Sequence, residues 1–246
     1  MYTNLTGYKI YTGSKNDLVH IIRKHLLSNG NQKLNIVSGN PEVLFNGLND
    51  SSLKKYFCRD DSIIIPDGVG ITMLLKILNK IRISKIAGID IMDEVLKICN
   101  EQLLKIYFVG STNENILLAV NNISKKYPNI KIAGYDDGYF GNDSDGVSQR
   151  IMKSEPHVVL VAMGSPRQDV FINKYIDLFN CKLFMGVGGS FDLYAGKLNR
   201  APKIMINLGL EWLYRVSKEP VRIVRLISIP KFMIRSFKYH FKGSNE

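Results

Sequence analysis

The chain contains little cysteine and no long apolar run. Its 246 residues include three cysteines, Cys58, Cys99 and Cys181, which lack the close spacing of a zinc site or a redox motif. We therefore expect reduced thiols in the protein core, as is usual in a reducing compartment. Because no stretch of about 18 uncharged apolar residues is present, we expect no membrane-spanning helix. The polar first 17 residues lack the apolar segment of a signal peptide, which predicts a protein in the cytosol or on the cytosolic face of a membrane.

Acidic residues are scarce relative to basic ones. The chain has 33 Lys and Arg against 22 Asp and Glu, a formal net charge of +11. From Lys197 onward, eleven basic residues stand against three acidic ones, so +8 of this charge lies in the last fifth of the chain. Such an excess favours an anionic partner, which nucleic acid, a phosphorylated ligand or anionic lipid would each satisfy.

Short apolar runs alternate with longer helical patterns. We predict strands at residues 33–37, 62–65, 105–109, 130–134, 157–162 and 182–186. We predict helices near residues 17–27, 69–81, 91–101, 113–126, 146–153 and 167–179. Strands that are apolar on both sides and alternate with helices are typical of a parallel sheet covered on both faces. The expected fold class is therefore α/β, with a Rossmann-like, mostly parallel sheet.

The pattern changes after Gly196. The strands stop there, and two basic helical stretches follow at about residues 204–217 and 220–241. We therefore expect a Rossmann-like core at residues 1–196 and a basic helical C-terminal appendage at residues 197–246. Pro220 suits the first turn of the second helix, whereas Pro230 is expected to kink it.

Ligands in such folds bind in the crevice at the carboxyl ends of the strands, so the residues there are candidate site residues. Asp67 follows an apolar strand and stands between Pro66 and Gly68, which places a carboxylate at the rim of the crevice. A base in this position is suited to accept a proton from an acceptor hydroxyl. The alternative is an Asp that caps a helix or shapes a turn.

Two other strand ends carry small or polar residues. Ser38 and Asn40 follow the first predicted strand, where they would bind a phosphate or sugar hydroxyl or cap the next helix. Gly110 and Ser111 follow another strand, and glycine there allows the backbone to approach an anion at the next helix N-terminus. For both pairs, the sequence is compatible either with ligand binding or with a local structural role.

A further strand end combines glycine with polar residues. Gly164 is followed by Pro166, Arg167 and Gln168 at the start of a predicted helix. A cation is unfavourable in the first turn of a helix, so Arg167 indicates an anionic ligand or a nearby carboxylate.

The last strand end contains three glycines within four residues. Gly186, Gly188 and Gly189 indicate close approach of the backbone to a ligand. Phe191 occupies the third glycine position of the dinucleotide fingerprint, which argues against a Rossmann oxidoreductase. Asp192 would cap the helix, bind a ligand or contact an arginine of the C-terminal appendage.

Metal-ligand patterns are weak. The histidines are scattered, and the Asp-x-Asp sequence at residues 143–145 lies in a polar loop typical of a solvated turn. We therefore expect no metal site.

The tail combines arginines with an amphipathic pattern. Arg215, Arg222 and Arg225 are spaced seven and three residues apart, which brings them to one face of a continuous helix. In residues 221–241, apolar and aromatic residues alternate with Lys and Arg, a pattern typical of helices that bind a membrane interface. The alternatives are a surface helix packed on the core and a contact with nucleic acid.

Taken together, these blocks resemble the WecG/TagA/CpsF glycosyltransferases, glycosyltransferase family 26. Six blocks occur in the family's order and span about residues 34–225: IPDGVGI, IAGIDIMDEVL, YPNIKIAGYDDGYF, VAMGSPRQDVFI, GVGGSFDLYAGKLNRAP and GLEWLYRVSKEPVRIVR. The resemblance implies an inverting transfer of a hexose-type sugar from a UDP-sugar to a polyprenyl-diphosphate-linked saccharide, with no cofactor and no required metal. The resemblance leaves three candidates for the donor sugar: N-acetylmannosamine, its uronic acid and glucose.

The resemblance also implies roles for individual residues. Asp67 matches the family's proposed catalytic base, and the appendage arginines match residues thought to close over the active site. The implied catalytic set is Asp67, Gln168, Arg215, Arg222 and Arg225. The substrate-binding set, taken from the strand ends and the matching blocks, is Ser38, Asn40, Gly68, Lys85, Asp90, Gly110, Ser111, Gly164, Pro166, Arg167, Gly188, Gly189, Asp192 and Arg200.

Two positions depart from the family pattern. Lys85 stands where many members have Arg, and Asp169 stands where Glu is more usual. Both residues keep the charge, but Lys lacks the bidentate fork of Arg.

The implied partners are a UDP-sugar, a polyprenyl-diphosphate-linked saccharide and an anionic membrane surface, with no nucleic acid. The sequence is compatible with a monomer or with a homo-oligomer. We expect a peripheral protein on the inner face of the bacterial cytoplasmic membrane, acting in O-antigen, capsule, common-antigen or teichoic acid synthesis. The competing hypothesis is a non-enzymatic nucleotide or nucleic-acid binding module. It accounts for the basic charge but not for a carboxylate in the crevice or for the apolar character of the tail.

Overall fold

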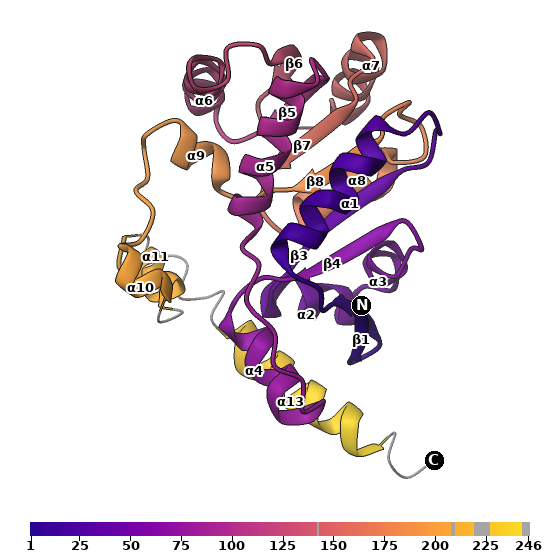
Figure 1. Cartoon of the computed structure of the whole chain (residues 1–246), viewed down its shortest axis with the longest axis vertical. Helices are drawn as coiled ribbons and strands as arrows, with labels where there is room; N and C mark the ends of the chain where they lie inside the picture. The colour runs from indigo at the N-terminus through magenta and orange to yellow at the C-terminus, as the bar shows by residue number, and fades with distance from the viewer. Residues whose placement is uncertain (142, 208–209, 219–226, 243–246) are drawn as a thin grey trace.

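The computed structural model describes residues 1–141, 143–207, 210–218 and 227–242, which fold around one central sheet (Figure 1). The eight strands lie in the order β1-β2-β4-β3-β8-β7-β5-β6. β1 pairs antiparallel with β2, and every other neighbouring pair is parallel. The strands are β1 (Tyr2–Leu5), β2 (Tyr8–Tyr11), β3 (Leu34–Gly39), β4 (Ser62–Pro66), β5 (Lys105–Gly110), β6 (Lys131–Asp136), β7 (Val158–Ala162) and β8 (Leu183–Gly186). The predicted fold class and all six predicted strands are confirmed.

Helices cover both faces of the sheet because the central strands are apolar on both sides. In β7, Val158 and Leu160 pack into one core cluster, whereas Val159 and Val161 pack into the other. The first face is covered by α1 (Lys15–Leu27), α5 (Gly88–Glu101), α6 (Asn113–Lys126) and α9 (Ser190–Tyr194). The second face is covered by α2 (Pro41–Asn49), α3 (Ser51–Phe57), α4 (Val69–Leu78), α7 (Ser144–Ser154) and α8 (Arg167–Tyr175).

Local sequence signals start several of these helices. Ser14 and Asp17 form a capping box, in which each side chain accepts a hydrogen bond from the backbone N–H of the other residue. Asn40 caps α2 by accepting from the N–H of Val43 at 3.0 Å, and Pro41 occupies the first helical turn. The capping role of Asn40, left open by the sequence, is therefore present.

The N-terminal hairpin was not predicted. Thr6 and Gly7, with φ of 56° and 81°, form the turn between β1 and β2. β2 then joins the parallel sheet next to β4, where Ile10 lies opposite Ile64. One prediction on the cysteines is also wrong, since Cys99 and Cys181 are buried but Cys58 is exposed.

The appendage is helical, but its elements differ from the two predicted helices. The first prediction is split into α10 (Lys203–Asn207) and α11 (Glu211–Lys218), with Leu210 outside both. α13 (Ser228–Lys242) begins close to Pro230, which lies in its first turn and does not kink it. A proline fits there because first-turn N–H groups have no acceptor within the helix. Arg215 lies on α11, whereas Pro220, Arg222 and Arg225 lie outside the described residues, so their shared face stays a prediction.

α13 packs on the core with one face and leaves the other exposed. Its contacts are with α2 and α4, and the three helices lie together at one end of the molecule (Figure 1). Phe232 is fully buried, and Ser236 accepts a hydrogen bond from Thr6 Oγ1 at 2.8 Å. Ile234, Tyr239 and Phe241 are exposed. No helix in the described part of the chain combines the length and the apolar character needed to cross a membrane.

Candidate active site

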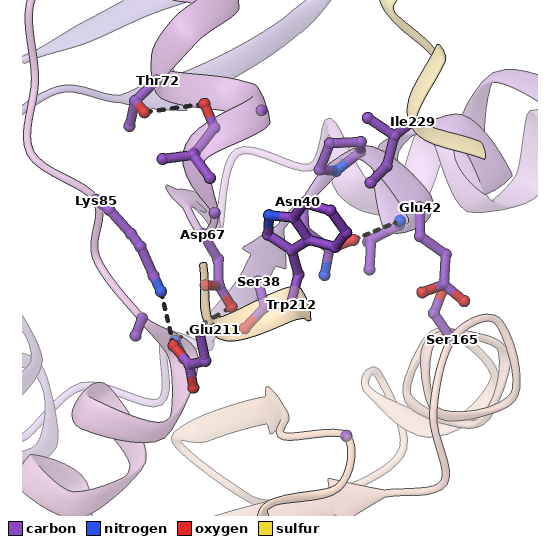
Figure 2. Close-up of a pocket in the computed structure, with 18 of the residues that line it drawn as sticks. Ser38, Asn40, Glu42, Asp67, Thr72, Lys85, Ser165, Glu211, Trp212 and Ile229 are labelled. Atoms are coloured by element: carbon purple, nitrogen blue, oxygen red, sulfur yellow. Dashed lines mark hydrogen bonds and ion pairs between the residues drawn. The ribbon is translucent and has the colours of Figure 1, made fainter. Parts of the chain in front are cut away.

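A cavity of about 990 Å³ opens at the carboxyl ends of the central strands, where the sequence predicts the site. It is bounded by the ends of β3, β4, β7 and β8, by α4, and by residues of α11 and α13. Figure 2 shows polar side chains from these elements projecting into it. Nine predicted site residues line the cavity: Ser38, Asn40, Asp67, Gly68, Lys85, Gly164, Gln168, Gly188 and Gly189.

Asp67 lies directly after β4, within the cavity. Gly68 follows it with φ of 103°, a conformation that L side chains rarely adopt, and α4 begins at the next residue. The Asp67 Oδ2 accepts a hydrogen bond from the backbone N–H of Gly88 at 3.3 Å. Gly88 is the first residue of α5, and the N-terminus of a helix interacts favourably with a carboxylate. The fold thus orients the carboxylate and leaves it facing the cavity.

Gly88 is a site residue that the sequence analysis missed, although it lies in the quoted IAGIDIMDEVL block. A Cβ at this position would lie 2.3 Å from the Ser38 Oγ and 3.3 Å from the Asp67 Oδ2. Only glycine lets the start of α5 approach both side chains. Gly88 therefore determines the relative positions of Ser38 and Asp67.

Gln168 holds the turn after β8. Its side chain is buried, and Oε1 accepts a hydrogen bond from the backbone N–H of Gly188 at 3.0 Å. A Cβ on Gly186 would lie 2.6 Å from the Gln168 Nε2, so the amide lies directly against the end of β8. Gln168 borders the cavity but acts here as a positioning residue for the Gly186–Gly189 backbone.

Asp169 is buried beside the site. Its Oδ2 has no hydrogen-bond partner in the described structure. Burial raises the pKa of Asp169 to about 7, the Ser165 hydroxyl opposes the shift, and the charge of Glu42 adds to it. The carboxyl group of Asp169 is therefore partly protonated near neutral pH, whereas the sequence predicted a retained charge at this position.

The rim of the cavity is completed by α11. Glu211 forms an ion pair with Lys85, with 2.8 Å between Oε2 and Nζ. The next residue, Trp212, projects into the same cavity as Asp67 and Asn40 (Figure 2). Neither Glu211 nor Trp212 was predicted, although both lie in the quoted GLEWLYRVSKEPVRIVR block. The predicted substrate-binding residue Lys85 lines the cavity, but its ammonium group is paired with Glu211 in this structure.

Two predicted residues lie beside the cavity. Arg200 donates a hydrogen bond to Asp90 at 2.7 Å, and its Nε lies 3.9 Å from Glu211. Neither Arg200 nor Asp90 is among the residues that line the cavity. They connect the start of α5 to α11.

A second polar cluster lies past the end of β5. The Ser111 hydroxyl donates to Asp192 at 2.6 Å, and the Asn115 amide donates to the same carboxylate oxygen at 2.9 Å. The Asp192 carboxylate is thus held by polar groups of the core. Gly110 packs against the backbone of Ala162.

Arg167 contacts the segment that follows β6. Its guanidinium donates to the Gly138 carbonyl and lies 5.5 Å from the centroid of the Tyr139 ring. The carbonyl and the ring occupy the cation for which the sequence predicted an anionic ligand or a carboxylate. Neither Arg167 nor the neighbouring Pro166 lines the cavity, and the same holds for Gly110, Ser111 and Asp192.

The described residues contain no group of three or more His, Cys, Asp or Glu side chains suited to hold a metal ion. At the Asp-x-Asp sequence, Asp145 pairs with Lys174 at 2.9 Å, and Asp143 lies 3.8 Å from Arg150. Both carboxylates are largely exposed as predicted, but Asp145 lies in the first turn of α7 and not in a loop.

Comparisons with known proteins identify relatives of this chain. The sequence profile of the "Glycosyl transferase WecG/TagA/CpsF family" matches residues 3–246. A Bacillus subtilis (strain 168) protein is 38% identical over 224 residues, covering 89% of this chain and 85% of its own length. A Staphylococcus aureus (strain MW2) protein is 34% identical over 221 residues, covering 90% and 86%. Each is named N-acetylglucosaminyldiphosphoundecaprenol N-acetyl-beta-D-mannosaminyltransferase.

Proposed function

Because the chain belongs to the WecG/TagA/CpsF family of glycosyltransferases, we propose that it transfers N-acetylmannosamine from a UDP-sugar to N-acetylglucosaminyl-diphosphoundecaprenol. As a family member the protein is a glycosyltransferase of cell-envelope polysaccharide synthesis, and the hypothesis of a non-enzymatic binding module is set aside. The relatives from Bacillus and Staphylococcus are named for this donor sugar and this acceptor. Their names favour N-acetylmannosamine over the uronic acid and glucose that the sequence left open.

The observation that carries the proposal is the position of Asp67. Its carboxylate faces the cavity at the carboxyl end of β4, held by the N–H of Gly88. Asp67 accepts the proton of the acceptor sugar hydroxyl as that oxygen attacks the anomeric carbon of the donor. The UDP leaves from the opposite side, so a single displacement converts an α-linked donor into the β-linked product that the relatives' name describes.

The departing UDP diphosphate requires positive charge and N–H donors. The Gly188–Gly189 turn borders the cavity and brings backbone close to it. The appendage arginines Arg215, Arg222 and Arg225 are proposed to add positive charge, and no metal is required. We propose that the nucleoside end of the donor extends beyond the cavity lining to the cluster of Gly110, Ser111 and Asp192, whose hydroxyl and carboxylate groups suit a ribose.

Membrane association is part of the proposal. The exposed face of α13 carries Ile234 and Phe241 together with the exposed Lys231 and Lys238. Apolar and cationic side chains on one helix favour an anionic lipid surface. The protein would then meet its lipid-linked acceptor as a peripheral protein on the inner face of the cytoplasmic membrane.

The direct test is a panel of UDP-sugars offered with N-acetylglucosaminyl-diphosphoundecaprenol. UDP-N-acetylmannosamine should give a lipid-linked disaccharide, whereas UDP-glucose and the UDP-uronic acid should give none. Transfer from UDP-glucose at an equal rate would contradict the choice of donor. Absence of transfer from every donor would contradict the reaction.

A further inference from the structure

The cavity has two chemically different ends. The end at the strands is polar, with Ser38, Asn40, Asp67 and Gln168. The other end lies between α4, α11 and α13, and its side chains are largely apolar: Val69, Met73, Val216, Ile229, Pro230 and Met233. A sugar offers many hydroxyl groups and little apolar surface, so these side chains fit a different part of a ligand.

The apolar end is continuous with the catalytic end because both involve the start of α4. This helix begins two residues after Asp67, and Val69 and Met73 stand one turn apart along it. Both side chains are partly exposed, at 39% and 43%, and both line the cavity. A ligand bound at Asp67 therefore has an apolar path outward along α4 toward α13.

Two cations line the same cavity. Lys76 lies on α4, one turn beyond Met73, and Arg82 lies between α4 and α5. Both are exposed, and neither forms an ion pair with any residue that the structure describes. Lys85, by contrast, is already paired with Glu211. Lys76 and Arg82 are therefore available to bind an anion such as a diphosphate.

We propose that the apolar end of the cavity binds the first isoprene units of the lipid acceptor, and that Lys76 and Arg82 bind its diphosphate. This assignment rests on the proposed function, which supplies a sugar, a diphosphate and a polyprenyl chain in that order. The sugar occupies the Asp67 end. Because Met73 and Lys76 stand one turn apart on α4, the diphosphate binds the two cations while the adjoining isoprene units contact Met73 and Met233. α13 then has two roles, because its exposed face meets the membrane while Ile229, Pro230 and Met233 border the lipid path.

The test compares two acceptors that share N-acetylglucosaminyl diphosphate, one with undecaprenyl and one with a methyl group. Met73→Glu should lower the ratio of kcat/KM for the long over the short acceptor at least tenfold. The matched control is Ile77→Glu, which changes an exposed residue of the same helix that does not line the cavity. Met73→Ser, a milder variant, should lower the same ratio by a smaller factor. All assays use detergent micelles, so that differences in membrane binding between variants do not affect the measured ratio.

The cations are tested with the same pair of acceptors. Lys76→Ala and Arg82→Ala should each raise KM for both acceptors at least fivefold while leaving KM for the UDP-sugar within twofold. The control is Lys80→Ala, an exposed lysine close to the end of α4 that does not line the cavity.

Four outcomes would overturn the assignment or the function on which it rests. An unchanged acceptor ratio in both Met73 variants would show that the chain binds elsewhere. A rise in KM confined to the UDP-sugar in the Lys76 and Arg82 variants would assign these cations to the donor diphosphate. A wild-type protein that transfers nothing to either acceptor would refute the proposed function itself, whereas normal wild-type transfer with unaffected variants would refute only the lipid path.

Discussion

Lys85 and Glu211 form an ion pair across the rim of the cavity, with Nζ 2.8 Å from Oε2 and side chains that are 20% and 8% exposed. The pair joins the segment before α5 to the first residue of α11, the helix that carries Trp212 and Arg215. A largely buried carboxylate is costly without its partner. The pair therefore holds α11 over the cavity.

Breaking the pair should loosen α11 before it affects the core. In Glu211→Gln, amide exchange of residues 211–218 should accelerate roughly tenfold or more, because the lost charge-assisted hydrogen bond is worth about 1.5–3 kcal/mol to local docking. Exchange within β7 should stay unchanged. Lys85→Met should also accelerate this exchange. The loss of docking free energy in the double variant should be smaller than the sum of the losses in the two single variants. Strict additivity would show that the pair does not hold the helix.

Gly88→Ala should impair turnover through Ser38 and Asp67. The added Cβ would lie 2.3 Å from the Ser38 Oγ, so that side chain must move and the space beside Asp67 changes. We expect kcat to fall at least about tenfold with modest loss of stability, since a misplacement of about 1 Å is enough for such losses. In a Ser38→Ala background the 2.3 Å contact is removed and the 3.3 Å contact with Asp67 Oδ2 remains, so adding Gly88→Ala should lower kcat by a clearly smaller factor. Equal effects of Gly88→Ala in both backgrounds would contradict this reason.

Asp169→Asn should change how stability depends on pH. The raised pKa means that the native state binds this proton more tightly than the unfolded state, whose carboxyl titrates near its ordinary value of 3.8. The contribution of Asp169 to wild-type stability should therefore be lost as pH rises from about 4 through 7, whereas the variant shows no such loss. Above pH 7 the variant should be more stable, by an upper limit of about 4 kcal/mol. Urea unfolding at pH 5 and pH 8 measures the difference, and an identical pH dependence would contradict it.

The exposed face of α13 can be tested without disturbing its packed face. Truncation of the tail is a poor test, because Phe232 is buried against the core and its loss would destabilise the fold. Ile234→Ser combined with Phe241→Ser should instead reduce co-sedimentation with phosphatidylglycerol vesicles at least about tenfold, while the melting temperature stays nearly unchanged. Neutral phosphatidylcholine vesicles and the exposed but distant Leu178→Ser serve as controls. Undiminished binding would contradict a membrane role for this face.

The sequence could predict what depends on local pattern and on strand ends. The strands of the parallel sheet were predicted because their apolar runs are bounded by turns. Ser38 and Asp67 were each identified because they stand at a strand end, and the pairing of β3 with β4 brings them into one cavity. The β1–β2 hairpin was missed because its short strands mix tyrosines with polar residues and resemble a polar N-terminal segment.

Other parts of the site depend on contacts between distant residues. Glu211 lies 126 positions from Lys85 in the chain, so no local pattern indicates that the lysine is paired. The role of Gly88 follows from the close approach of α5 to Ser38, which only the folded chain shows. Arg167 was expected to meet an anion or a carboxylate, but Gly138 and Tyr139 bind it through a carbonyl and an aromatic ring.

The central claim is that Asp67 is the base of an inverting N-acetylmannosaminyl transfer. The most direct measurement is the product formed from UDP-N-acetylmannosamine and N-acetylglucosaminyl-diphosphoundecaprenol by the wild type and by Asp67→Asn, with the anomeric configuration determined by NMR. The wild type should give a β-linked disaccharide, and the variant should lose a factor of about 10²–10⁴ in kcat while keeping its fold. An α-linked product, or normal turnover by a folded Asp67→Asn protein, would contradict the account.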